Sequence, residues 1–126
     1  MDPSRIIAAR HALLALHKAI IAAERVDLER IEGRLAANQM LDRLVTDERF
    51  AWLRPMTALI VALDELLEGD VPADAETYVA RAIELLTPEA ASDGDLFAVE
   101  YLRLLHERPE VTMEHASAMR VLRAKG

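Results

Sequence analysis

The sequence predicts an all-α protein, an up-and-down helical bundle of about five to six helices with a long N-terminal helix. Three observations carry this prediction. Apolar residues recur at the spacing of a helix face through most of the chain. Proline and glycine stand mainly between these periodic segments. The intervening segments are short, which favours neighbouring helices that run antiparallel.

Length and composition indicate the class of protein. A chain of 126 residues is typical of one domain, so we expect residues 1–126 to form a single helical-bundle domain. Aromatic residues make up only 4%, which predicts an aliphatic core. The net charge of −7 argues against nucleic acid or an anionic membrane as a partner. The absence of cysteine excludes disulfides and thiolate catalysis, and favours a reducing cytoplasm.

The first periodic segment predicts a helix that runs to about Glu32 and ends at Gly33, with Asp2 as its N-cap and Pro3 at its first position. One apolar row repeats every seven residues and consists of Ile7, Leu14, Ile21 and Leu28. Because this helix is longer than the later helices can cover, we predict a homo-oligomer or another protein partner. Charged and polar side chains interrupt its apolar run, so we expect neither a signal peptide nor a membrane span of about 20 residues.

A polar row runs along the same helix. Arg10, His17 and Glu24 also repeat every seven residues, between two apolar rows and near the middle of the face expected to be buried. Buried polar groups are costly unless they are paired. We therefore predict that Arg10 meets a carboxylate, that Glu24 meets an arginine, and that His17 is the most buried of the three. The row is either a structural device that sets helix register or a site for an anionic or zwitterionic ligand.

The middle of the chain contains the only tryptophan and the longest uncharged apolar run. Pro55 suits the first position of a helix that continues to about Glu68. Arg54 precedes this proline, which predicts an extended backbone at Arg54 and places its side chain near unpaired carbonyl groups. A short helical turn before it would bury Trp52 at the end of the bundle. We interpret Trp52, Arg54 and Pro55 as structural residues at a corner.

The remaining elements follow from the same signals. We expect helices over 36–46, 74–86 and 96–107, the second of them capped by Asp74. Thr112 is predicted to cap a last helix, Met113 to Ala124, whose apolar face is thin. Such a helix lies on the surface, exchanges with a second copy or frays at its end.

The sequence offers no catalytic constellation. No histidine follows a glutamate by three residues and no His-x-x-x-His occurs, so carboxylate di-metal and zinc-hydrolase helices are excluded. Residues seven apart on a helix are separated by about 10.5 Å, too far for His17 and Glu24 to share an ion unaided. His115 is expected to be solvated. We predict no catalytic residue, no metal site and no cofactor.

Two blocks, His11–Lys18 and Phe50–Pro55, are followed by the run from Leu59 to Glu65. Together they resemble an uncharacterised family of small all-helical bacterial proteins, over roughly residues 5 to 70. The resemblance implies a bacterial cytoplasmic protein and brings no activity, cofactor or catalytic residue.

Two functions remain open at this level. The first is a non-enzymatic helical interaction or structural protein that self-associates or binds another protein. The alternative is a small-molecule-binding bundle or small enzyme that uses Arg10, His17 and Glu24. Side chains that point into a cavity of ligand size favour the alternative, whereas pairing in a closed core favours the first.

Overall fold

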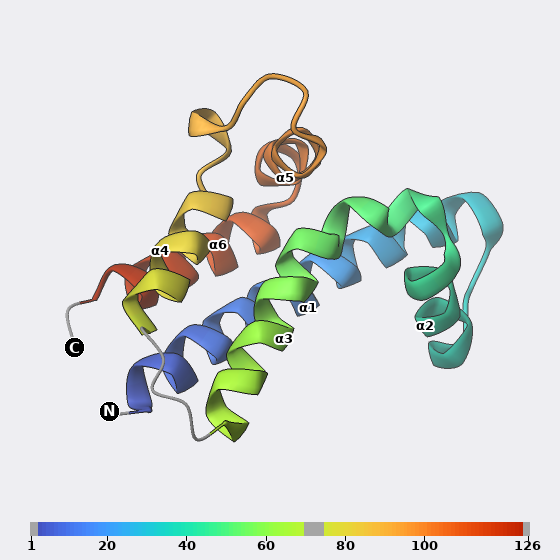
Figure 1. Cartoon of the computed structure of the whole chain (residues 1–126). Coiled ribbons are helices and arrows are strands. Elements are labelled where there is room, and N and C mark those ends of the chain that lie inside the picture. Colours follow the sequence, from blue (N-terminus) through green and yellow to red (C-terminus); the bar gives the residue numbers. More distant parts are fainter. Residues whose placement is uncertain (1–2, 70–74, 125–126) are drawn as a thin grey trace.

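The structure is a computed structural model that describes residues 3–69 and 75–124. The described residues form an all-α helical bundle with a long N-terminal helix, as the sequence predicts (Figure 1). The α-helices are α1 (Ser4–Glu32), α2 (Ala37–Thr46), α3 (Arg54–Glu68), α4 (Ala75–Leu85), α5 (Leu96–Glu107) and α6 (Pro109–Arg123). Two short 3₁₀-helices, η1 (Glu48–Leu53) and η2 (Pro88–Ala90), connect some of them.

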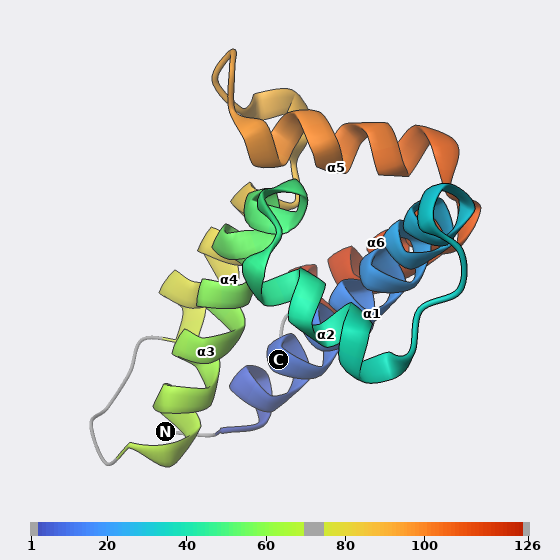
Figure 2. The same ribbon diagram turned by 90° about the vertical axis from the view of Figure 1, so that its right-hand side faces the viewer.

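Helix α1 is the centre of the bundle. Helix α6 packs along one side of it and α3 along another, while α4 fills the space between α3 and α6 (Figures 1 and 2). Helix α5 departs from the up-and-down arrangement, because it runs across the others at one end of the bundle (Figure 2). The core contains fully buried aliphatic side chains from α1, α3, α4, α5 and α6, among them Leu13, Leu16, Met56, Leu63, Ala82, Leu104 and Leu122.

A second, smaller core lies where α2 turns back beside the C-terminal half of α1. It consists of Leu28, Met40 and Phe50, with partly buried aliphatic side chains packed around them. Met40 is the only buried residue of α2. Helix α2 is therefore attached to the bundle by one edge, and much of its surface faces away from it.

The ends of α1 agree with the sequence analysis where they are described. Gly33 ends the helix with φ +84°, in the left-handed region that glycine adopts without strain. The first helical residue is Ser4, one position after the predicted start at Pro3. The predicted caps Asp2 and Asp74 lie outside the described residues.

The prediction of an extended backbone at Arg54 is wrong. Arg54 has φ −52° and ψ −41°, so α3 begins at Arg54 and Pro55 is its second residue. The residue before a proline is disfavoured in the α region but is not excluded from it. Here η1 leads directly into α3, and this continuous path buries both Trp52 and Leu53, which offsets the local cost. The Arg54 side chain is exposed, with the Glu48 carboxylate 4.0 Å away.

The prediction of a thin, loosely held last helix is also wrong. Helix α6 begins at Pro109 and not at Met113 after a Thr112 cap, because Pro109 occupies the first turn, where its missing N–H is harmless. The earlier start adds Val111 to a buried face that continues through Ala118 and Leu122. Small side chains allow close approach to α1, so a face with few large residues still packs well.

Candidate functional site

The three residues of the polar row meet three different partners. Arg10 Nε donates a hydrogen bond to the Asp64 carboxylate on α3. Glu24 accepts a hydrogen bond from Arg103 on α5. His17 lies between them, with its Nε2 atom 3.4 Å from the Thr57 hydroxyl oxygen on α3. The structure therefore does not bring Arg10, His17 and Glu24 together into one site.

Glu24 is the most buried member of the row, with only 2% of its surface exposed, so the prediction that His17 is most buried is wrong. Arg103 Nη2 lies 2.8 Å from one Glu24 oxygen, and Arg49 Nε lies 3.8 Å from the other. Arg103 also donates to Glu100 and Glu107, at 3.1 and 3.2 Å. One guanidinium thus joins α1 to α5 and neutralises a carboxylate that would otherwise be buried with its charge unpaired.

Arg10 and Glu24 pair as predicted, one with a carboxylate and one with an arginine. Both contacts connect α1 to another helix, and their hydrogen-bonding groups are turned toward that partner. This geometry is that of structural ion pairs.

His17 has different surroundings. It is half-buried, and burial lowers the pKa of its imidazole below the ordinary histidine value. Its separation of 3.4 Å from the Thr57 hydroxyl is long for a hydrogen bond, so the contact is weak. The neutral imidazole therefore retains capacity to accept or donate a further hydrogen bond.

His17 lines a groove of about 430 Å³, which we call the α2 groove. The groove lies between α2, η1, the start of α3 and the middle of α1. Its buried and half-buried apolar lining consists of Ile21, Leu44, Phe50, Ala51 and Leu53. Its polar lining consists of His17, Asp47, Arg54 and Thr57. Asp47 is already engaged, because it accepts hydrogen bonds from the Arg43 side chain and the Arg49 backbone N–H.

Two aliphatic side chains on α2 complete the groove and project into solvent. Leu41 is 64% exposed and Val45 is 77% exposed, and the two lie one helical turn apart on the same face. The opposite edge of α2 is held by Met40 and by Arg43, which pairs with Glu32 across the connection from α1. An amphipathic helix fixed in this way presents an apolar edge that its own bundle does not cover.

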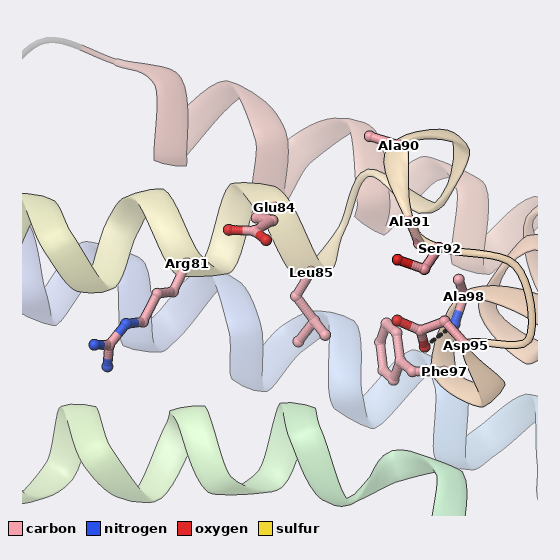
Figure 3. A pocket seen from close by; sticks show the side chains of 9 residues that line it. All are labelled: Arg81, Glu84, Leu85, Ala90, Ala91, Ser92, Asp95, Phe97 and Ala98. Atoms are coloured by element: carbon pink, nitrogen blue, oxygen red, sulfur yellow. Dashed lines mark hydrogen bonds between the residues drawn. The ribbon is translucent and has the colours of Figure 1, made fainter.

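A second pocket lies between the end of α4, η2 and the start of α5 (Figure 3). Its volume is about 380 Å³. Asp95 is occupied as the N-cap of α5, where its side chain accepts a hydrogen bond from the Ala98 N–H. Arg81 extends away from Ser92 and Asp95, and its guanidinium lies 5.0 Å from the centre of the Tyr78 ring. The polar groups of this pocket do not converge on a common point.

The prediction that His115 is solvated is wrong, because its side chain is half-buried. Its Nδ1 atom forms a 2.6 Å hydrogen bond with the hydroxyl of Tyr101, which is fully buried. Burial raises the pKa of Tyr101 and lowers the pKa of His115. The two rings continue a row of aromatic contacts through Phe97 to Trp52, with centroids 5.4 to 5.5 Å apart. Sequence reasoning missed this pair because its members lie on different helices.

Two further features of the structure bear on metal binding and on membrane insertion. Within residues 3–69 and 75–124, no three histidine or acidic side chains gather closely enough to hold a metal ion. By length and composition alone α1 is apolar enough to cross a membrane, so the expectation that no such segment exists was too strict. A core helix and a signal sequence both satisfy the same criterion, and α1 here packs its inner face against α3 and α6.

No protein-family model, no curated protein and no solved structure matches the chain. The resemblance to small helical bacterial proteins therefore stays a prediction. The functional interpretation rests on the geometry of the α2 groove and of the polar row.

Proposed function

We propose that this chain is a non-enzymatic interaction protein that binds another protein chain through the α2 groove. The observation that carries the proposal is the pair Leu41 and Val45, exposed beside a groove with a mainly apolar lining. Exposed aliphatic side chains grouped at a groove are typical of a surface that a partner covers. The mode of binding that fits is a helix laid into a groove, with apolar side chains one turn apart as anchors.

The energetics are consistent with a specific contact of moderate strength. Covering a largely exposed leucine or valine stabilises a complex by on the order of 1–2 kcal/mol each. His17 and Thr57 add polar groups that orient a partner, since their mutual hydrogen bond is weak. Arg10 and Glu24 take no part in this proposal because their charges are neutralised within the bundle.

The experiment places a photo-crosslinking amino acid, p-benzoylphenylalanine, at position 45 and expresses the chain in its native cells. Position 113 is the matched control, because Met113 is 72% exposed and lies on α6, outside the groove. We expect a discrete protein adduct from position 45 and none from position 113. Leu41→Asp in the same chain should remove the adduct. Equal labelling from both positions, or none from position 45, would contradict the proposal.

A second candidate function is binding of a small apolar molecule in the same groove. One observation favours it: the His17 imidazole and the Thr57 hydroxyl converge on a space of about 430 Å³, within the range of small-molecule sites. Native mass spectrometry of the protein from its own host tests this candidate. It predicts a retained compound that His17→Leu releases, without any protein adduct at position 45.

We propose further that the protein acts in the bacterial cytoplasm with α1 as a core helix. The burial of Leu13, Leu16 and Ile20 against other helices supports this, as does the pairing of Glu24. Cell fractionation checks it. A protein that stays with membranes after a high-salt wash would contradict the proposal.

A further inference from the structure

We propose that the occupant of the α2 groove is α2 of a second copy of this chain, in a dimer with two-fold symmetry. This inference rests on the proposed function and names its partner. In such a dimer the same patch serves both copies, so the patch must be complementary to itself.

The shape of the patch fits a second copy of itself. The patch contains both a ridge and a hollow: Leu41 and Val45 project from α2, and the α2 groove opens directly beside them. A two-fold axis near α2 would set the two α2 helices antiparallel, with the ridge of each copy against the groove of the other. Leu41 and Val45 of each copy would then cover Ile21 and Leu44 of the partner, which are only partly buried in the single chain.

The charges on the patch fit a second copy as well. Asp42 is exposed next to this ridge, and within the described residues its carboxylate has no ion pair or hydrogen bond. Arg54 lies across the groove, and its nearest carboxylate is Glu48, at the limit of an ion pair. One rim of the patch therefore carries the Asp42 carboxylate and the other carries the Arg54 guanidinium. A two-fold axis would place Asp42 of each copy beside Arg54 of the other, so the contact forms twice.

The net charge of the chain is compatible with this contact. The chain carries −7, which disfavours contact between arbitrary faces of two copies. At the α2 groove the other charges are already neutralised internally, since Arg43 pairs with both Glu32 and Asp47. Self-association at this patch therefore brings few unpaired like charges together. The length of α1 was the reason for predicting an oligomer from the sequence. It no longer supports one, because α3 and α6 pack along this helix.

Analytical ultracentrifugation of the full chain at tens of micromolar tests the proposal. We expect a particle of about twice the 14.1 kDa chain mass. Val45→Glu should raise the dimer dissociation constant at least about tenfold. Val99→Glu is the control, because Val99 is also exposed but lies on α5 outside the groove, and it should leave the constant unchanged.

A charge exchange identifies the geometry. Asp42→Arg and Arg54→Asp should each weaken the dimer by about tenfold, since each occurs twice and creates a like-charge contact. The two changes combined should restore most of the affinity. Both side chains are exposed, so circular dichroism should show an unchanged fold in every variant.

Three results would overturn the inference: a monomer at every concentration, a dimer indifferent to Val45→Glu, or no recovery in the doubly exchanged chain. The crosslinking at position 45 separates it from the proposed function. An adduct of twice the chain mass supports both, an adduct with a different protein overturns only the self-association, and no adduct overturns both.

Discussion

Glu24 and Arg103 show how a single buried charge connects two helices. Glu24 is 2% exposed, whereas Arg103 is partly solvated and has two further carboxylate partners. The pair is therefore asymmetric. Loss of the glutamate leaves a cation that is still paired, but loss of the arginine leaves a buried anion with only Arg49 nearby, at 3.8 Å.

This asymmetry predicts the order of two substitutions. Arg103→Ala should destabilise the fold by about 3 kcal/mol, near the lower end for an orphaned buried charge because Arg49 remains. Glu24→Leu should cost less, about 1–2 kcal/mol, because Arg103 keeps Glu100 and Glu107 as ion-pair partners. Urea unfolding of both variants measures the difference. If Glu24→Leu instead lowers the free energy of unfolding more than Arg103→Ala does, then Arg103, and not Glu24, is the side chain that needs its ion-pair partner.

His17→Leu is the control for the Arg103→Ala and Glu24→Leu variants. It is half-buried beside Ile21 and its contact with Thr57 is weak, so His17→Leu should leave the free energy of unfolding unchanged or slightly raised. If this variant instead destabilises the fold as much as Arg103→Ala, the polar row acts structurally along its whole length.

The two half-buried histidines also predict a dependence of stability on pH. Burial lowers the pKa of both His17 and His115 in the folded chain, and the nearby Arg123 lowers that of His115 further, against the opposing effect of Glu89. The unfolded chain therefore binds these protons at higher pH than the folded chain does. Stability should be independent of these groups above about pH 6.5 and should fall as the pH drops below it.

Urea unfolding at a series of pH values from neutral downward measures this slope. His115→Gln is the informative variant, because an amide oxygen still accepts a hydrogen bond from the Tyr101 hydroxyl but does not titrate. Its loss of stability on acidification should be smaller than that of the unmodified chain. An equal loss in both chains would assign the effect to other groups.

At the scale of the helix, the depth of the polar row follows from helical geometry. A seven-residue repeat turns by about 20° per repeat around a straight α-helix. The row therefore starts at the edge of the buried face with Arg10 and enters that face by Glu24, which agrees with their exposures. The leucines and isoleucines that flank His17 led to the prediction that it lies deepest, whereas this drift makes Glu24 the deepest member.

Helix α6 provides the sharpest test of helix packing. Ala118 is buried in the core, whereas Ala116 on the same helix is exposed. Ala118→Leu should destabilise the fold by about 1–3 kcal/mol, because the added side chain overfills a packed contact. Ala116→Leu should change stability little. Thermal melting of the two variants checks the prediction, and equal melting temperatures would show that α6 does not pack as the structure describes.

At the scale of the whole molecule, Trp52 joins the middle of the chain to the helix that crosses the bundle. It is buried as the sequence predicts, and its ring lies 5.5 Å from that of Phe97 on α5. Trp52→Ala should reduce stability by about 3–5 kcal/mol through lost burial and the cavity left behind. A melting temperature unchanged within error would mean that this corner of the molecule is open to solvent.

Local sequence signals were enough to predict the helical class, most helix boundaries, the aliphatic core of α1 and the burial of Trp52. It also determined the chemical type of partner that Arg10 and Glu24 require. These features depend on periodicity and on end signals a few residues long, which any stretch of chain carries locally. The start of α6 was misjudged because Thr112 is an acceptable N-cap and Pro109 an acceptable first-turn residue, and only the buried position of Val111 distinguishes the two starts.

The tertiary structure alone decided which residues meet. Asp64 and Arg103 lie 54 and 79 positions from their partners in the polar row, and many other acids and arginines would have satisfied the same chemistry. The α2 groove arises from the angle at which α2 turns back on α1, and the bond between Tyr101 and His115 from the crossing of α5 with α6. Periodicity specifies the face of a helix but not its neighbour, because the neighbour depends on how the helices cross in space.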